Sequence, residues 1–95
     1  MSGQEYITAF KRFAGNLLQQ YSVDVVRIPD ANREQKLHVL EKAMYKMENE
    51  LNGKVADIIA VTEANPAINE YQLEKGLREV FSSSLKELLR RNYRG

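Results

Sequence analysis

The feature that most constrains the fold is an apolar stripe near the middle of the chain. Its members recur at alternating intervals of three and four residues, the repeat of one helical face: Leu37, Leu40, Met44, Met47 and Leu51. The stripe covers two heptads, whereas a free-standing coiled coil usually shows about three to four. It therefore predicts a helix that buries this face inside a bundle. Asp30 or Asn32 is the expected N-cap, and Asn52-Gly53 is expected to end the helix.

A second apolar face predicts a helix at the start of the chain, over about residues 3–21. Ser2 and Glu5 have the spacing of a capping box, in which two side chains satisfy free amide groups of the first turn. The apolar positions that follow again recur at three and four: Tyr6, Phe10, Phe13, Ala14, Leu17, Leu18 and Tyr21.

Residues 22–29 differ in composition from the helical stretches on either side. They are rich in β-branched side chains, and Pro29 favours an extended conformation at Ile28. Our first interpretation is an extended linker that lies across the core. The alternatives are a short strand paired with its copy in a dimer and a continuation of the helix. Because Val25, Val26 and Ile28 would form a sticky edge, we expect another surface to cover them.

Two further segments show helical spacing after Gly53. The first is a short helix expected at about 54–64, with a strand as the alternative because its apolar positions are β-branched. The second is one helix expected over about 69–92, with Asn69 and Gln72 capping its start. Ser84 and Glu87 have the spacing of another capping box, so two helices joined at the serines are the alternative.

Taken together, these elements predict an all-α fold. The natural way to bury several amphipathic faces is a compact antiparallel bundle, here of three to four helices with one extended segment at about 22–29. A chain of 95 residues has the usual size of one domain. We therefore expect residues 1–95 to form a single helical domain.

The residues that usually carry catalysis or bind metals are scarce. The chain has no cysteine, and its one histidine, His38, is expected at the edge of the apolar stripe. Neither a catalytic triad nor a zinc site of ordinary spacing fits this set, and the scattered glycines form no phosphate-binding loop. We therefore expect no enzymatic activity, no cofactor and no metal.

The start of the chain lacks a basic segment followed by an apolar one, so no secretion signal is expected. No apolar run approaches the roughly 20 residues that span a bilayer. The absence of cysteine fits a reducing compartment. These features predict a cytoplasmic protein with no membrane partner.

Charge is balanced overall, with 14 basic against 13 acidic residues, but the end of the chain is basic. Its cations are Lys86, Arg90, Arg91 and Arg94. Such a cluster can neutralise phosphates, so a nucleic-acid-associated protein is one hypothesis. The alternative is that cations in the last turn complement the helix dipole.

Our first functional hypothesis is a small binding or regulatory protein that acts through protein–protein contact. Methionines on the central stripe adapt to irregular partners, and surplus apolar surface on a small domain favours self-association. The expected contact residues are Val25, Val26 and Ile28, together with Tyr45, which is either an outward-pointing anchor or a partly buried tyrosine at the boundary of the core. The partner is another protein or a second copy of this chain, and a homodimer is the expected assembly.

Overall fold

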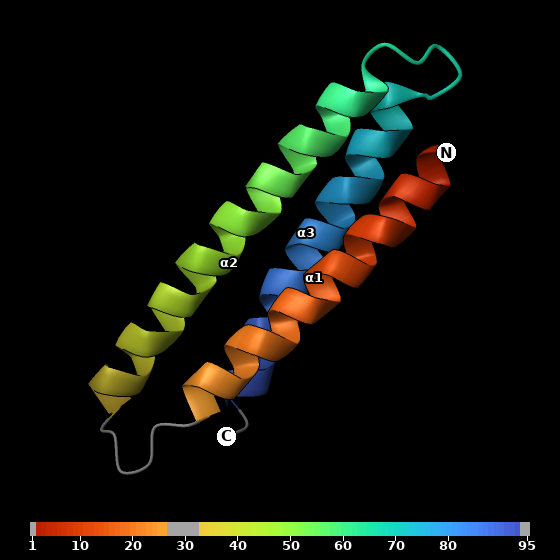
Figure 1. Ribbon diagram of the computed structural model, residues 1–95. Coiled ribbons are helices and arrows are strands. Elements are labelled where there is room, and N and C mark those ends of the chain that lie inside the picture. Colours follow the sequence, from red (N-terminus) through yellow and green to blue (C-terminus); the bar gives the residue numbers. More distant parts are fainter. Residues whose placement is uncertain (1, 27–32, 94–95) are drawn as a thin grey trace.

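The computed structural model describes residues 2–26 and 33–93, apart from the side chains of residues 23–26, 33, 92 and 93. Within these residues the chain forms three helices, α1 (Gly3–Val26), α2 (Arg33–Thr62) and α3 (Glu70–Tyr93). They lie side by side in a rod of 54 × 18 × 17 Å, with α2 running opposite to α1 and α3 (Figure 1). The prediction of an all-α bundle is confirmed, with three helices in the described residues.

The predicted caps of α1 and α3 are present. The Glu5 N–H donates to Ser2 Oγ at 3.2 Å, and the Ser2 hydroxyl lies 3.4 Å from the Glu5 carboxylate. At α3, the Gln72 N–H donates to Asn69 Oδ1 at 3.1 Å. The bonds to Ser2 Oγ and Asn69 Oδ1 each satisfy an amide that has no partner inside its own helix, whereas the Glu5 carboxylate meets the Ser2 hydroxyl and not the Ser2 amide of a full capping box.

The prediction of an extended segment is wrong for residues 22–26, because α1 continues to Val26. The helix propensity of β-branched residues is only a few tenths of a kcal/mol poorer than that of good helix formers, so packing can override it. At this end of α1, Tyr21 is buried and the Ser22 hydroxyl donates to the Leu18 carbonyl at 2.6 Å. Residues 27–29 of the predicted segment lie outside the described residues.

The predicted break at Asn52-Gly53 is also wrong. A single helix, α2, replaces the helix that was expected to end there and the short one expected at 54–64. One exposed glycine inside a helix costs about 1 kcal/mol. That cost is smaller than the gain from keeping Leu51 and Ile58, both buried, on one continuous face. The expected N-caps Asp30 and Asn32 lie outside the described residues.

The serines do not interrupt α3, so one helix is the correct alternative. The Ser84 hydroxyl donates back to the Val80 carbonyl at 2.7 Å and caps no new helix. Leu77 and Leu88, on either side of the serines, are fully buried. The apolar face therefore stays in phase along the whole helix.

The core runs along the axis of the rod and takes side chains from all three helices. The central stripe supplies buried Leu40, Met47 and Leu51, while Met44 is partly buried and Leu37, near the start of α2, is 42% exposed. At the far end of the rod, Ile68 in the α2–α3 connection is buried. The bundle thus buries most of the inner face of α2 and leaves its opposite face outside.

Candidate interaction surfaces

The side of α2 that faces away from the bundle forms a continuous exposed strip. A residue advances by about 100° around a helix, so intervals of three and four on this side define a second face opposite the buried stripe. We call it the α2 outer face: His38, Lys42, Tyr45, Asn49, Asn52, Ala56, Ala60 and Glu63. All of these residues are exposed. Glu63 follows Thr62 but keeps the helical pattern, since its N–H donates to the Ile59 carbonyl at 2.9 Å.

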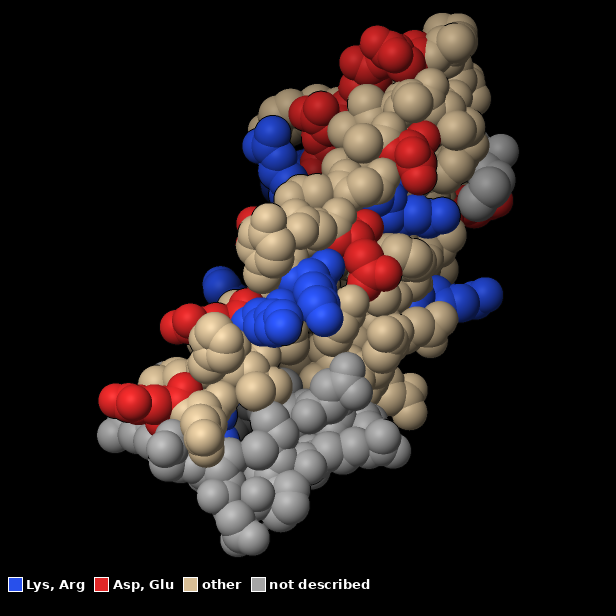
Figure 2. Space-filling model, turned by 60° about the vertical axis from the view of Figure 1, so that its left-hand side comes forward, with Lys and Arg blue, Asp and Glu red and all other residues tan. Residues whose placement is uncertain are grey.

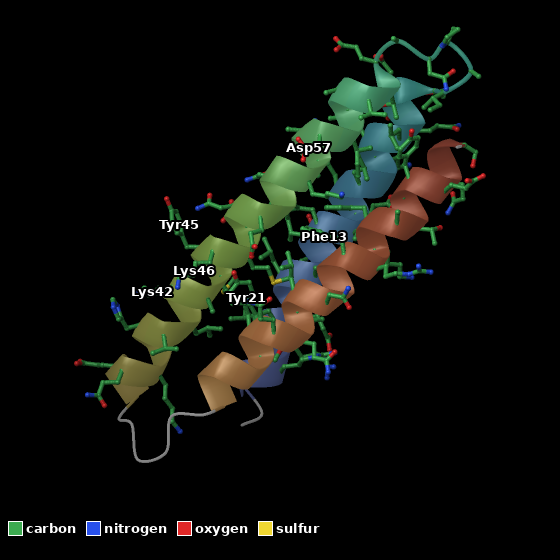
Figure 3. The ribbon with its side chains drawn as sticks, viewed as in Figure 1. Phe13, Tyr21, Lys42, Tyr45, Lys46 and Asp57 are labelled. Atoms are coloured by element: carbon green, nitrogen blue, oxygen red, sulfur yellow. The ribbon has the colours of Figure 1, made fainter. Side chains whose placement is uncertain are left out.

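Tyr45 is the most prominent side chain of this face. It is 67% exposed and points away from α1 and α3 (Figure 3). An aromatic ring in water leaves a large apolar surface available to a partner, and its hydroxyl supplies a hydrogen-bonding group. The sequence singled out Tyr45, and the structure places it on the outside of the bundle.

Charge is unevenly distributed along α2. Lys42 and Lys46 lie in its first half, whereas Asp57 and Glu63 lie at its far end. Figure 2 shows the same trend on this side of the molecule, with acidic side chains gathered at the end of the rod where α2 finishes and a basic patch near its middle. Among the described residues, Lys42, Lys46 and Asp57 make no ion pair within the chain. Their charges are therefore open to a partner.

The valine-rich segment supplied three of the predicted contact residues. Val25 and Val26 lie in the last turn of α1 rather than in a strand, and their side chains are outside the described part of the chain. Ile28 lies outside it entirely. The structure therefore does not describe a surface formed by these three side chains.

At the end of α3, a carboxylate occupies the centre of the predicted basic cluster. Glu87 accepts two hydrogen bonds from Arg90, at 2.8 and 2.5 Å, and one from Arg91 Nε at 3.2 Å. These hydrogen bonds lower the pKa of Glu87 to about 2, and Glu87 in turn raises the pKa of Arg90. Arg94 lies outside the described residues. Two of the four predicted cations are thus already paired inside the chain.

Lys86 lies elsewhere on α3, along a shallow open hollow on the outer surface of that helix. Its lining alternates acidic, basic and polar side chains: Tyr71, Glu74, Lys75, Arg78, Glu79, Ser82, Ser83 and Lys86. All of them come from one helix, so no second element closes the hollow over a small molecule. A concave, mostly enclosed site is what small ligands usually require.

His38 is exposed on the α2 outer face. In the described residues, no three side chains of the types His, Asp and Glu come close enough to hold a metal ion. None of the described helices contains a stretch long and apolar enough to cross a membrane. The chain matches no known protein family, no curated protein and no solved structure.

Sequence reasoning found Tyr45 but missed the rest of the α2 outer face. The signal was present, because Asn49, Asn52, Ala56 and Ala60 continue the interval of three and four from Tyr45. It was hidden because these residues are polar or small, and a search for apolar stripes passes over them. The expected break at Gly53 also divided the face into two parts.

Proposed function

We propose that this chain is a small, non-enzymatic binding or regulatory protein that acts through protein–protein contact and self-associates as a homodimer. The observation that carries the proposal is Tyr45, a large aromatic side chain held outside the bundle at mid-length of α2. Tyrosine is enriched at the centres of protein interfaces because it buries a large area with few rotatable bonds.

The position of Tyr45 supports an interface more strongly than its exposure alone. Isolated exposed apolar side chains are normal on any protein surface. Tyr45, however, lies within an exposed strip that extends over most of the length of α2, flanked by lysines and acids that form no ion pair with the described residues. Apolar anchors surrounded by polar and charged side chains are typical of non-obligate interfaces.

Sedimentation velocity on the full chain at micromolar concentration tests this proposal. We expect a reversible dimer whose population rises with protein concentration. A species that stays strictly monomeric over the whole range contradicts the self-association.

The second candidate is a nucleic-acid-associated protein that uses Lys86, Arg90, Arg91 and Arg94. It is favoured by the gathering of cations at the end of α3 and disfavoured by Glu87, which already neutralises part of the charge of Arg90 and Arg91. Binding of mixed duplex or single strands at low salt, lost when Arg90 and Arg91 are replaced by glutamate, would support it. A chain that binds neither at low salt does not have this function.

We further propose that the protein acts in the cytoplasm. Because the sequence has no cysteine, its fold needs no disulfide and is compatible with a reducing compartment. Fractionation of cells that express the tagged chain tests this placement, and recovery in a membrane or extracellular fraction would contradict it.

A further inference from the structure

We propose that two copies of this chain pair in an antiparallel arrangement through the α2 outer face, with Tyr45 packed over the partner's Ala56. This inference rests on the proposed function, because it specifies the surface and the geometry of the self-association. It follows from three properties of the strip: its length, the order of its large and small residues, and the order of its charges.

The strip is long enough for a helix-to-helix contact. At the rise of an α-helix, His38 and Glu63 are about 38 Å apart. None of the residues of the strip is buried by α1, α3 or the described connection, and the intervals of three and four keep them on one side. A second helix laid along this side meets a side chain at every turn, as in an antiparallel helix pair.

The order of large and small residues fits an antiparallel copy. When Tyr45 lies level with the partner's Ala56, its ring faces a methyl group rather than another bulky side chain. The same register places Asn49 level with the partner's Asn52, where the two amides can exchange hydrogen bonds and avoid the cost of unpaired buried polar groups. It also places His38 level with the partner's Glu63. Each contact occurs twice, because a two-fold axis makes the interface self-complementary.

The order of charges also fits. Lys46 and Asp57 lie on the same flank of α2 (Figure 3), and the antiparallel register brings Lys46 within about one turn of the partner's Asp57. On the other flank, Glu41 and Glu48 lie level with the partner's Ala60 and Gly53, not with each other. A parallel pair would instead place the central residues of the strip opposite their own copies, so that Lys42 would face Lys42 and Tyr45 would face Tyr45, and like charges in register destabilise an interface.

Cysteine cross-linking tests the pairing, because the natural chain has no cysteine. The double variant His38→Cys/Glu63→Cys places a thiol at each end of the strip, on two exposed positions that leave Tyr45 intact. With a short thiol-specific cross-linker we expect covalent dimers from this variant. The matched controls are the single variants His38→Cys and Glu63→Cys. They should not cross-link, because like thiols would lie about 38 Å apart along the pair.

Each outcome has a defined meaning. Covalent dimers from the single variants indicate a parallel pair and overturn the proposal. A dimer in sedimentation without cross-linking of the double variant indicates another surface; it also overturns the antiparallel pairing but leaves the proposed self-association standing. A monomer in sedimentation contradicts both. Circular dichroism shows whether each variant keeps the helical content of the natural chain.

A charge swap tests the pairing without cysteines. We expect Lys46→Glu and Asp57→Lys each to weaken the dimer, by about tenfold at low salt, since two attractive pairs become repulsive. The combined Lys46→Glu/Asp57→Lys chain should regain the natural affinity. Lys11→Glu, an exposed position on α1, is the matched control for Lys46→Glu because it changes the net charge by the same amount. Single variants that dimerise like the natural chain, or a swap that fails to restore affinity, contradict the pairing.

Discussion

Glu87 accepts hydrogen bonds from two arginines because Arg90 and Arg91 follow it by three and four residues on the same helix. Both cations also lie in the last turn of α3, where positive charge complements the helix dipole. The cluster is therefore explained by the local structure of a helix end. The sequence predicted the cations, with complementing of the helix dipole as one explanation. It indicated Glu87 only as a possible capping residue and not as the partner of Arg90 and Arg91.

The protonation of Glu87 provides the first prediction. Its folded pKa of about 2 lies below the ordinary value of 4.5. The carboxylate therefore stabilises the folded helix end at pH values above 4.5, and this contribution is lost as the pH falls through 4.5 toward about 2. In an NMR titration of side-chain carboxyl carbons, the midpoint of Glu87 should lie near 2, well below the ordinary 4.5. The variant Arg90→Ala/Arg91→Ala should return its midpoint toward the ordinary value, and an unchanged midpoint would contradict the assignment.

Tyr21 shows how a side chain links two helices across the bundle. Its hydroxyl donates to Glu50 Oε2 at 2.5 Å, joining α1 to α2 (Figure 3). Sequence reasoning placed Tyr21 on the apolar face but had no way to pair it with a glutamate 29 residues away. Such a pair depends on how the two helices are placed relative to each other.

We predict that Tyr21→Phe lowers the free energy of unfolding by about 1 kcal/mol, the usual contribution of a hydrogen bond of this kind. The matched control is Tyr45→Phe, which removes a hydroxyl from an exposed ring and should stay within about 0.5 kcal/mol of the natural chain. Urea denaturation of both variants measures the difference. Equal effects of the two substitutions would show that the Tyr21–Glu50 bond does not stabilise the bundle.

At the scale of elements, the sequence predicted the faces of the helices better than their ends. Leu40, Met47 and Leu51 of the central stripe are buried as expected, because the apolar interval is a property of one continuous helix. The ends at Tyr21 and Asn52 were placed wrongly, since β-branched residues and a glycine carry only small local penalties. Packing against a neighbouring helix outweighs such penalties, and no local pattern shows where that neighbour lies.

The helical glycines allow a test of helix propensity against packing with a neighbouring helix. Gly15 and Gly53 have open space where a Cβ would stand, whereas a Cβ at Gly76 would come within 3.0 Å of Ile7 Cγ1 across the α1–α3 contact. We predict that Gly15→Ala and Gly53→Ala each raise the free energy of unfolding by about 0.5–1 kcal/mol. Gly76→Ala should lower it by about 1 kcal/mol, because overpacking outweighs the gain in propensity.

Thermal or urea denaturation of the three alanine variants measures these signs. Gly76→Ala combined with Ile7→Ala is the control, because removing the isoleucine side chain frees the space that the new methyl group needs. In the Ile7→Ala background, Gly76→Ala should then lower the free energy of unfolding less than it does in the natural chain. A Gly76→Ala variant as stable as Gly15→Ala would show that α1 and α3 can separate slightly without cost.

For the molecule as a whole, one face of each helix closes the core, and α2 presents an unused face with an aromatic anchor. Dimerisation through that face couples assembly to stability, because a partner that binds only the folded state stabilises it.

We therefore predict that the Tm of the natural chain rises with protein concentration. Tyr45→Ala should weaken this dependence and should have a lower Tm than the natural chain only at high concentration. Tyr71→Ala removes a ring that is 75% exposed on α3, so it is the matched control and should behave like the natural chain. Differential scanning calorimetry over a wide range of concentrations measures all three, and a Tm of the natural chain that does not change with concentration would contradict the coupling.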